Sequence, residues 1–179
     1  MAGNLQEKLE DSRIILIHTE MSDNEVSDTI VNLIKWSNIN PKDEISLYVT
    51  SESRDFCNVM AIYDTIKSIP NPISVFCLGE VRAFGIIFLA AASKGKRYAL
   101  KHTEFVLEEP LGRLGAGANQ TTEISIAAKK ATAERNAFES VLAEAFEMPI
   151  EKIHQDCQAS LRLKADEAKA YGIIDKVLE

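Results

Sequence analysis

Hydrophobic residues along this chain fall into short continuous runs separated by longer stretches with helical spacing. Short apolar runs rich in β-branched side chains predict buried strands. On this basis strands are expected at residues 13–17, 45–49, 73–78, 98–100, 104–107 and 173–178. Between them, apolar residues three or four positions apart predict amphipathic helices. This alternation predicts one α/β domain over residues 1–179, with right-handed crossovers between its parallel strands.

The expected helices have identifiable start and stop signals. Ser22 and Glu25 form a capping box, which opens a helix whose predicted apolar face is Val26, Ile30, Leu33 and Ile34. The apolar face of the next helix consists of Phe56, Val59, Met60, Tyr63 and Ile66, and the helix ends before Pro70. Later helices are expected from about Phe84 to Ala92, over 122–146, from Pro149 to Cys157, and over 165–171 with Gly172 as cap.

The turn after the strand at 73–78 has the layout of a serine-peptidase nucleophile turn, yet it contains no serine. A side chain at position 83 would lie beside unpaired amides at the start of the following helix, where negative charge is stabilised. Residue 83 is alanine, and its methyl group has neither a lone pair nor a proton to lose. Nucleophilic catalysis from this position is therefore excluded. The alternative is an ordinary strand–turn–helix with small residues for close packing.

Composition narrows the classes of partner. The chain has 179 residues, of which 46% are hydrophobic, enough to bury a sizeable core. Its 27 acidic and 20 basic residues give a net charge of −7, which argues against a nucleic acid or an anionic membrane as partner. The densest basic cluster, Lys94, Lys96 and Arg97, follows a predicted helix and has a structural interpretation, because cations stabilise helix C-termini.

The cysteines and the N-terminus indicate a cytoplasmic protein. Cys57, Cys77 and Cys157 are odd in number and lack paired spacing, so neither a disulfide framework nor a zinc site is expected. No cofactor motif is present. The first residues lack a cationic start followed by an apolar segment, and the longest apolar run, 86–92, is far shorter than the roughly 18 residues of a membrane span.

Several strings along the chain resemble the ClpP family, the proteolytic subunit of the ATP-dependent Clp protease. They are AIYDTI at 61–66, CLGE at 77–80, LAA at 89–91, KGKRYAL at 94–100, PLG at 110–112 and EAKAYGIID at 167–175. The resemblance runs from about Leu9 to Leu178, with a few extra residues around 115–120. It implies a ClpP/crotonase-like α/β fold of repeated β-β-α units. It also implies a protruding handle, formed by the strand and long helix at about 104–147, that joins two rings.

The resemblance implies a serine peptidase of two stacked seven-membered rings around a closed chamber, fed by an AAA+ unfoldase. In the family pattern the nucleophilic serine falls at Ala83, the histidine base at Glu108 and the orienting aspartate at Ser160. All three residues are replaced here. A triad without nucleophile, base and orienter has no route to an acyl-enzyme, so the resemblance implies a non-catalytic member similar to ClpR-type subunits.

Two further segments depart from the family pattern. The paired glycines of the family's oxyanion loop correspond to Ser53 and Arg54, and residues with a Cβ there change the backbone that presents the oxyanion donors. About a dozen residues precede Ile14 and match poorly the segment that forms the axial pore loops, so docking of an unfoldase has weak support. The apolar positions available for a handle contact, or for the core, are Leu114, Ile124, Ile126, Ala127, Ala131, Phe138 and Leu142.

The leading hypothesis is a non-catalytic ClpP-like subunit with a structural or regulatory role. It would assemble with itself, as a heptamer or tetradecamer, or with an active ClpP paralogue. The alternative is a crotonase-like enzyme that binds an acyl-CoA and uses Glu108 as acid or base. Glu109 is adjacent, and neighbouring strand residues point to opposite faces, so only one of the two glutamates can enter such a site.

A third hypothesis is a peptidase with different catalytic groups. Cys57 or Cys77 with His102, or Ser53 with His18, supply a nucleophile and a base on paper. A cysteine in a strand or on a helix face is usually an inert small hydrophobe, and a histidine at a strand break is usually solvent-facing. No third orienting group is identified for either set, and the remaining histidine, His154, lies on a polar helix.

Overall fold

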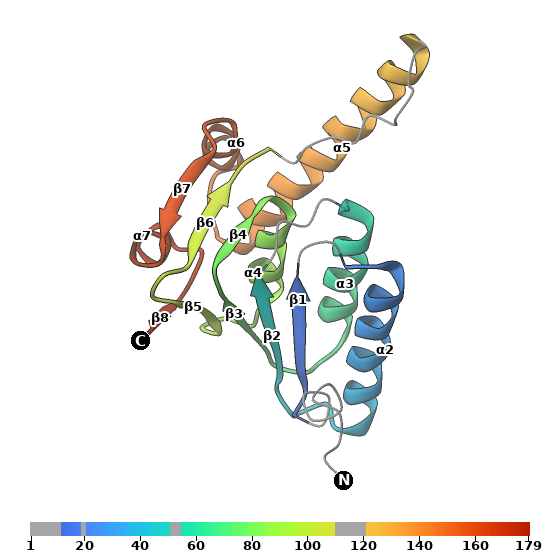
Figure 1. The fold of residues 1–179 in the computed structure, drawn as a ribbon, viewed down its shortest axis with the longest axis vertical. Helices are drawn as coiled ribbons and strands as arrows, with labels where there is room; N and C mark the ends of the chain where they lie inside the picture. The colour runs from blue at the N-terminus through green and yellow to red at the C-terminus, as the bar shows by residue number, and fades with distance from the viewer. Residues whose placement is uncertain (1–11, 19–20, 51–54, 110–120) are drawn as a thin grey trace.

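A parallel sheet forms the centre of the molecule. The computed structural model describes residues 12–18, 21–50, 55–109 and 121–179. Five parallel strands have the order β1-β2-β3-β5-β8 (Figure 1). They are β1 (Ile14–His18), β2 (Ile45–Thr50), β3 (Ile73–Cys77), β5 (Arg97–Leu100) and β8 (Lys176–Leu178). This is the α/β class predicted from the alternating pattern.

A second, smaller sheet lies beside the first. It consists of β4 (Glu80–Arg82), β6 (Glu104–Leu107) and β7 (Leu161–Lys164) in the order β4-β6-β7, with β7 antiparallel to β6. β4 and β7 were not predicted, because three or four residues are too short to show an alternating pattern. The last strand is also shorter than expected: Ile173 and Ile174 are buried, but they precede β8.

The helices follow the predicted signals closely. They are α2 (Asp23–Ile39), α3 (Phe56–Ser68), α4 (Ile87–Ala91), α5 (Thr121–Ala145), α6 (Ile150–Gln158) and α7 (Ala165–Tyr171). The capping box is confirmed: the Glu25 amide donates to Ser22 Oγ at 3.3 Å, and the Ser22 amide donates to the Glu25 carboxylate at 2.8 Å. Ile34 was wrongly placed on the apolar face of α2, since it is 47% exposed whereas Trp36 is 3% exposed.

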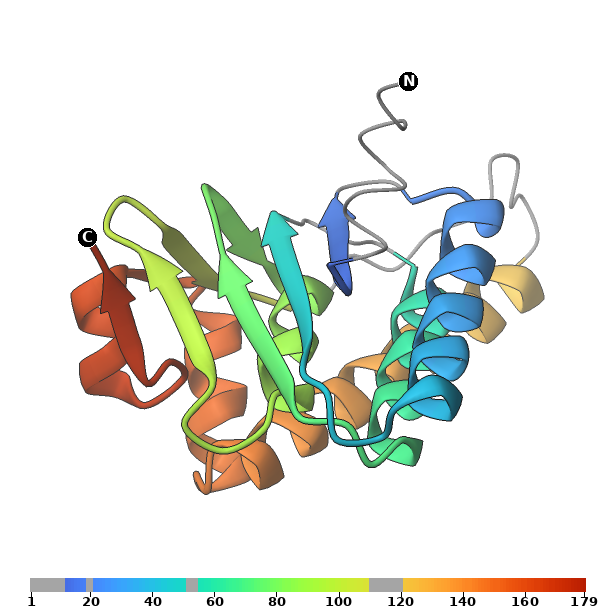
Figure 2. The same cartoon turned by 90° about the horizontal axis from the view of Figure 1, so that it is seen from below.

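The helices cover one face of the five-stranded sheet (Figure 2). Residues of β2 alternate between buried and half-buried, as expected when only one face is covered. On the less buried face, Tyr48, Phe76 and Tyr98 stand side by side on β2, β3 and β5, with ring centroids 4.8 and 4.9 Å apart. Stacked aromatic neighbours across strands therefore stabilise this face.

Helix α5 has two unlike halves. Its C-terminal half is anchored in the core by Phe138 and Leu142, and the Phe138 ring meets the edge of Phe84 at 5.6 Å. Its N-terminal half projects away from the body (Figure 1), and there Ile124 and Ile126 are 48% and 63% exposed. Leu114, another candidate for this region, lies outside the described residues. Of the helices described here, none combines the length and the hydrophobicity needed to cross a bilayer.

Candidate active-site region

The three triad positions meet at one end of the smaller sheet. Arg82 of β4 is paired with Val106 of β6, and Leu107 of β6 is paired with Leu161 of β7. Ala83 directly follows β4, Glu108 directly follows β6, and Ser160 directly precedes β7. Strand register therefore brings the three positions to the same end of the three strands, although they are up to 77 residues apart in the chain. The sequence predicted this grouping only through the family pattern.

Ala83 occupies a sharp turn. It begins a 3-10 turn, η1 (Ala83–Ile86), before α4 starts at Ile87, somewhat later than the helix start expected near Phe84. Its φ is +46°, in the left-handed region that non-glycine residues adopt rarely and at a cost of about 1 kcal/mol. The residue is only 6% exposed. A buried methyl group therefore lies at a backbone turn of unusual shape.

Glu108 is held by an arginine from the neighbouring strand. Arg82 Nε donates to one carboxylate oxygen at 2.8 Å and Nη2 donates to the other at 2.6 Å. The two side chains are 24% and 16% exposed. Arg82 also lies 3.3 Å from Glu80, which in turn meets Arg162 at 3.5 Å. Both oxygens of the Glu108 carboxylate thus already accept hydrogen bonds from a fixed guanidinium fork.

Ser160 lies in the turn between α6 and β7. Its φ is +49°, and the residue is exposed. Its amide donates to the carbonyl of Cys157 at 3.1 Å, which closes the turn after the helix. Ser53 and Arg54, the other predicted site residues, lie outside the described residues.

The comparison with protein families decides the relationship. A family model described as Clp protease matches residues 1–179. The chain belongs to the Clp protease family. Members of this family are serine proteases, and they form ring oligomers.

In this Clp protease family member, Glu109 engages a different partner from Glu108. Its carboxylate receives a hydrogen bond from Arg135 of α5 at 3.2 Å. Arg135 also lies 4.0 Å from Glu139, and Glu139 meets Nδ1 of His154 on α6 at 2.9 Å. The adjacent glutamates therefore contact separate groups. The cluster around Glu139 was missed, because β6, α5 and α6 contribute one group or more each and no short motif joins them.

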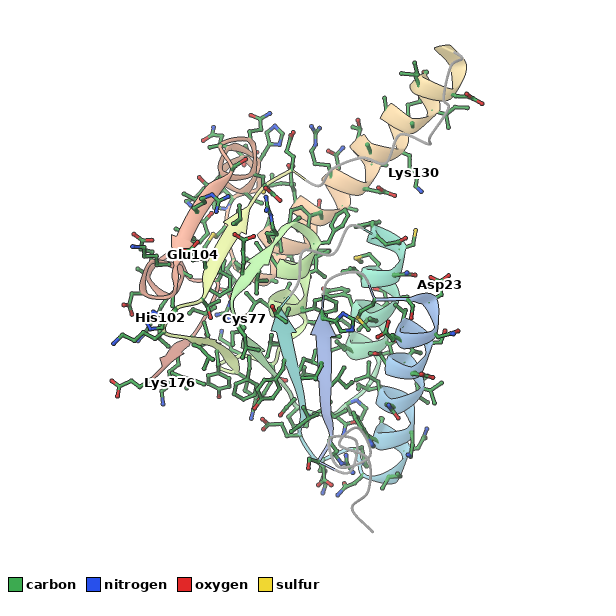
Figure 3. All side chains as sticks on the ribbon, viewed as in Figure 1. Asp23, Cys77, His102, Glu104, Lys130 and Lys176 are labelled. Atoms are coloured by element: carbon green, nitrogen blue, oxygen red, sulfur yellow. The ribbon has the colours of Figure 1, made fainter. Side chains whose placement is uncertain are left out.

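Among the described residues of this Clp protease family member, Cys77 and His102 are not arranged as a catalytic pair. Ser53, the nucleophile suggested for His18, lies outside those residues. Burial raises the pKa of the Cys77 thiol strongly, so it stays protonated at neutral pH. His102 is exposed in the turn between β5 and β6, as expected for a histidine at a strand break, and Figure 3 shows it outside the sheet that contains Cys77. His18 lies 3.1 Å from Glu25 and is therefore engaged at the start of α2.

Proposed function

We propose that this chain is a non-catalytic subunit of a Clp-type protease ring, with a structural or regulatory role. The observation that carries the proposal is the identity of residue 83: a buried alanine follows β4 at the position where the family pattern has its nucleophile. Loss of a serine nucleophile costs about six decades of rate in the subtilisin example. The Glu108 carboxylate is bound by Arg82 on both oxygens, which supports the same conclusion.

Assembly follows from the family and from the shape of α5. The projecting half of α5 exposes Ile124 and Ile126, and large apolar side chains on an unsupported helix favour association with another subunit. We propose that β6 and α5, residues 104–147, form the handle between two rings. The assembly is a ring of this chain alone, seven or fourteen subunits, or a mixed ring with an active ClpP paralogue, in the cytoplasm.

Native mass spectrometry of the tagged protein recovered from its own cell tests this proposal. A mixed barrel that contains a serine-bearing paralogue would establish a structural or regulatory subunit. A homo-oligomer without that paralogue would restrict the role to self-assembly and would turn attention to acyl-CoA binding, the alternative function. Labelling of the purified chain by a fluorophosphonate at a single stoichiometric site would overturn the proposal, because this reagent requires an activated nucleophile.

The role of α5 in assembly has a matched pair of variants. Ile126→Asp places a charge on the projecting half of α5, where the side chain is 63% exposed, so it should leave the fold intact and reduce the mass of the assembly. Ile150→Asp makes the same change on α6, where the side chain is 42% exposed, and should leave the mass unchanged. Equal masses for Ile126→Asp and the parent chain would remove α5 from the interface.

A further inference from the structure

Three potential metal ligands converge beside the candidate site, from three different elements. Glu109 follows β6, Glu139 belongs to α5 and His154 belongs to α6. Their ligand atoms all lie within 4.8 Å of one another. Glu139 is 4% exposed, and both its oxygens lie near Nδ1 of His154, at 2.9 and 3.1 Å. A buried carboxylate, a second carboxylate and an imidazole thus share one small volume.

The side chain of Arg135 lies at this cluster, and only some of its N–H groups have hydrogen-bond acceptors in the described part of the chain. Its Nη1 donates to Glu109 at 3.2 Å, and its Nη2 donates to the amide oxygen of Asn136 at 3.4 Å. Its Nε lies 4.0 Å from Glu139 and is buried without a hydrogen-bond acceptor in the described part of the chain. Buried N–H groups normally find an acceptor. The guanidinium is therefore a poor fit to the cation position between the two glutamates, and since its side chain is 30% exposed, it has a route to solvent.

Several carboxylates lie around this cluster in addition to Arg135. The thiol of Cys157 lies in the same region, and its pKa is raised to about 12 by burial first, and then by Glu139, Asp156 and other nearby carboxylates. Carboxylate oxygens and an imidazole nitrogen are ligand types that divalent metal ions take in proteins.

We propose that Glu109, Glu139 and His154 form a binding site for a divalent transition metal ion, with Zn²⁺ the best match. One imidazole nitrogen and two carboxylate oxygens suit zinc, and three protein ligands leave a fourth position for water. At tetrahedral angles, zinc–ligand bonds of about 2.0–2.2 Å place two ligand atoms about 3.3–3.6 Å apart. A movement of roughly 1–1.5 Å by the Glu109 side chain, which is 43% exposed, gives that separation, and Arg135 moves out as the ion enters.

The bound ion would join the end of β6 to α5 and α6. Glu139 lies between Phe138 and Leu142, which anchor α5 in the core, so an ion there would bind the base of the projecting helix to the rest of the domain. This inference does not depend on the proposed function. It concerns residues other than Ala83, Glu108 and Ser160.

Isothermal titration of the untagged, metal-free chain with ZnCl2 tests the site. Cys57→Ser serves as the parent protein, because Cys57 is the exposed cysteine and an adventitious ligand. The parent should bind one Zn²⁺ per chain. Glu139→Gln and His154→Gln should each weaken binding at least tenfold. His18→Gln and His102→Gln change the other two histidines of the chain and should leave the affinity unchanged.

Arg135→Ala separates a metal site from a plain ion-pair network. If the guanidinium competes with the metal, this substitution should tighten Zn²⁺ binding severalfold, and Co²⁺ should give a visible absorption band that His154→Gln abolishes. Absence of Zn²⁺ binding in both the parent and Arg135→Ala would overturn the proposal, as would binding that survives in His154→Gln. If circular dichroism shows that Glu139→Gln is unfolded, the Arg135→Ala titration and the Co²⁺ spectra decide the outcome.

Discussion

The molecule contains two arginine–carboxylate forks with nearly the same geometry and different surroundings. In one, Arg97 of β5 donates to both oxygens of Asp175, at 3.0 and 2.6 Å. In the other, Arg82 donates to both oxygens of Glu108, at 2.8 and 2.6 Å. The Arg97 fork has additional backbone bonds: the Arg97 amide donates to Asp175 at 2.9 Å, and the Asp175 amide donates to the Arg97 carbonyl at 2.8 Å.

The two forks are connected to the rest of the fold differently. Arg97 also donates to the carbonyl of Gly172, which caps α7, and its guanidinium lies over the Phe146 ring at 5.6 Å. It thereby holds the segment before β8 against the sheet. Arg82 contacts only side chains among the bonds described for it, Glu108 and Glu80. The same kind of charged pair therefore binds backbone groups in one place and, in the other, joins β4 to Glu108, a predicted triad position.

The largest expected effect concerns peptidase activity after the triad is rebuilt beside the Arg82–Glu108 fork. Ala83→Ser, Glu108→His and Ser160→Asp together should give peptidase activity at least about 100-fold below that of an active ClpP, because the loop at Ser53 and Arg54 stays unchanged. Glu108→His also removes a carboxylate that binds Arg82, and the guanidinium beside the new imidazole disfavours the imidazolium formed in catalysis. Cleavage of a short fluorogenic peptide measures this.

The control for the rebuilt triad adds Arg82→Gln, which removes the guanidinium beside position 108. Its activity should exceed that of the triple variant. Brisk cleavage by the triple variant alone would refute the prediction, and equal activity with and without Arg82→Gln would show that the fork has no influence on the site.

The Arg97–Asp175 pair, here called the framework fork, should contribute more to the free energy of unfolding than the Arg82–Glu108 pair. Asp175→Asn removes the charge that pairs with Arg97 and should lower the free energy of unfolding by about 3 kcal/mol, since it leaves the guanidinium uncompensated and weakens the bond from the Arg97 amide to Asp175. The melting temperature should fall by roughly 5–10 °C. Glu108→Gln is the matched change in the other fork and should cost about 1 kcal/mol. Equal losses in thermal or urea unfolding would contradict the distinction between the forks.

The framework fork should also make stability depend on acid pH. Burial acts to raise the pKa of Asp175, but hydrogen bonds from the side chain and amide of Arg97 outweigh it and lower that pKa below its ordinary value of 3.8. A depressed pKa in the folded state contributes stability above pH 3.8, and that contribution is lost as the pH falls through the folded value. Urea unfolding of the parent and of Asp175→Asn should therefore converge as the pH is lowered. A constant difference between pH 6 and pH 2 would argue against the pair.

The smallest expected effect concerns backbone strain at the site. Ser160 has φ +49° and an exposed side chain, so Ser160→Gly should raise the free energy of unfolding by about 0.5–1 kcal/mol. Ala83→Gly provides the contrast: it relieves the same strain at φ +46° but removes a buried methyl group, so its net effect should be near zero. A loss of stability in Ser160→Gly would mean that the hydroxyl has a structural role.

The fold was predictable where the signal is local. The capping box at Ser22 and the cap at Gly172, which has φ +102°, were both identified from neighbouring residues. The position of the main strands followed from continuous apolar runs. β4 and β7 escaped because their pairing with β6 depends on contacts between distant segments. Ile34 was misplaced because apolar residues alone do not reveal that the buried face of α2 is centred on Leu33 and Trp36.

The contacts of the candidate site were not predictable from the sequence. Ala83, Glu108 and Ser160 were named through the family pattern, and strand register places them at one edge. The partner of Glu108 was not foreseen, since Arg82 is 26 residues away and nothing in the spacing links them. The basic cluster at 94–97 proved to be paired, with Lys96 bound to Glu44 and Arg97 to Asp175, as its structural interpretation implied.

The buried Trp36 gives this chain a built-in reporter of cooperativity. It is the only tryptophan in the sequence, it is 3% exposed, and it lies on α2 near the edge of the sheet formed by β1, opposite the edge formed by β8. Its fluorescence emission therefore reports on the β1 side of the sheet, whereas the Arg97 fork holds the segment before β8 on the other side. If tryptophan emission and circular dichroism change at the same urea concentration in Asp175→Asn, the sheet unfolds as one unit. If emission changes at a higher urea concentration than circular dichroism, the β8 edge detaches while the β1 edge remains folded.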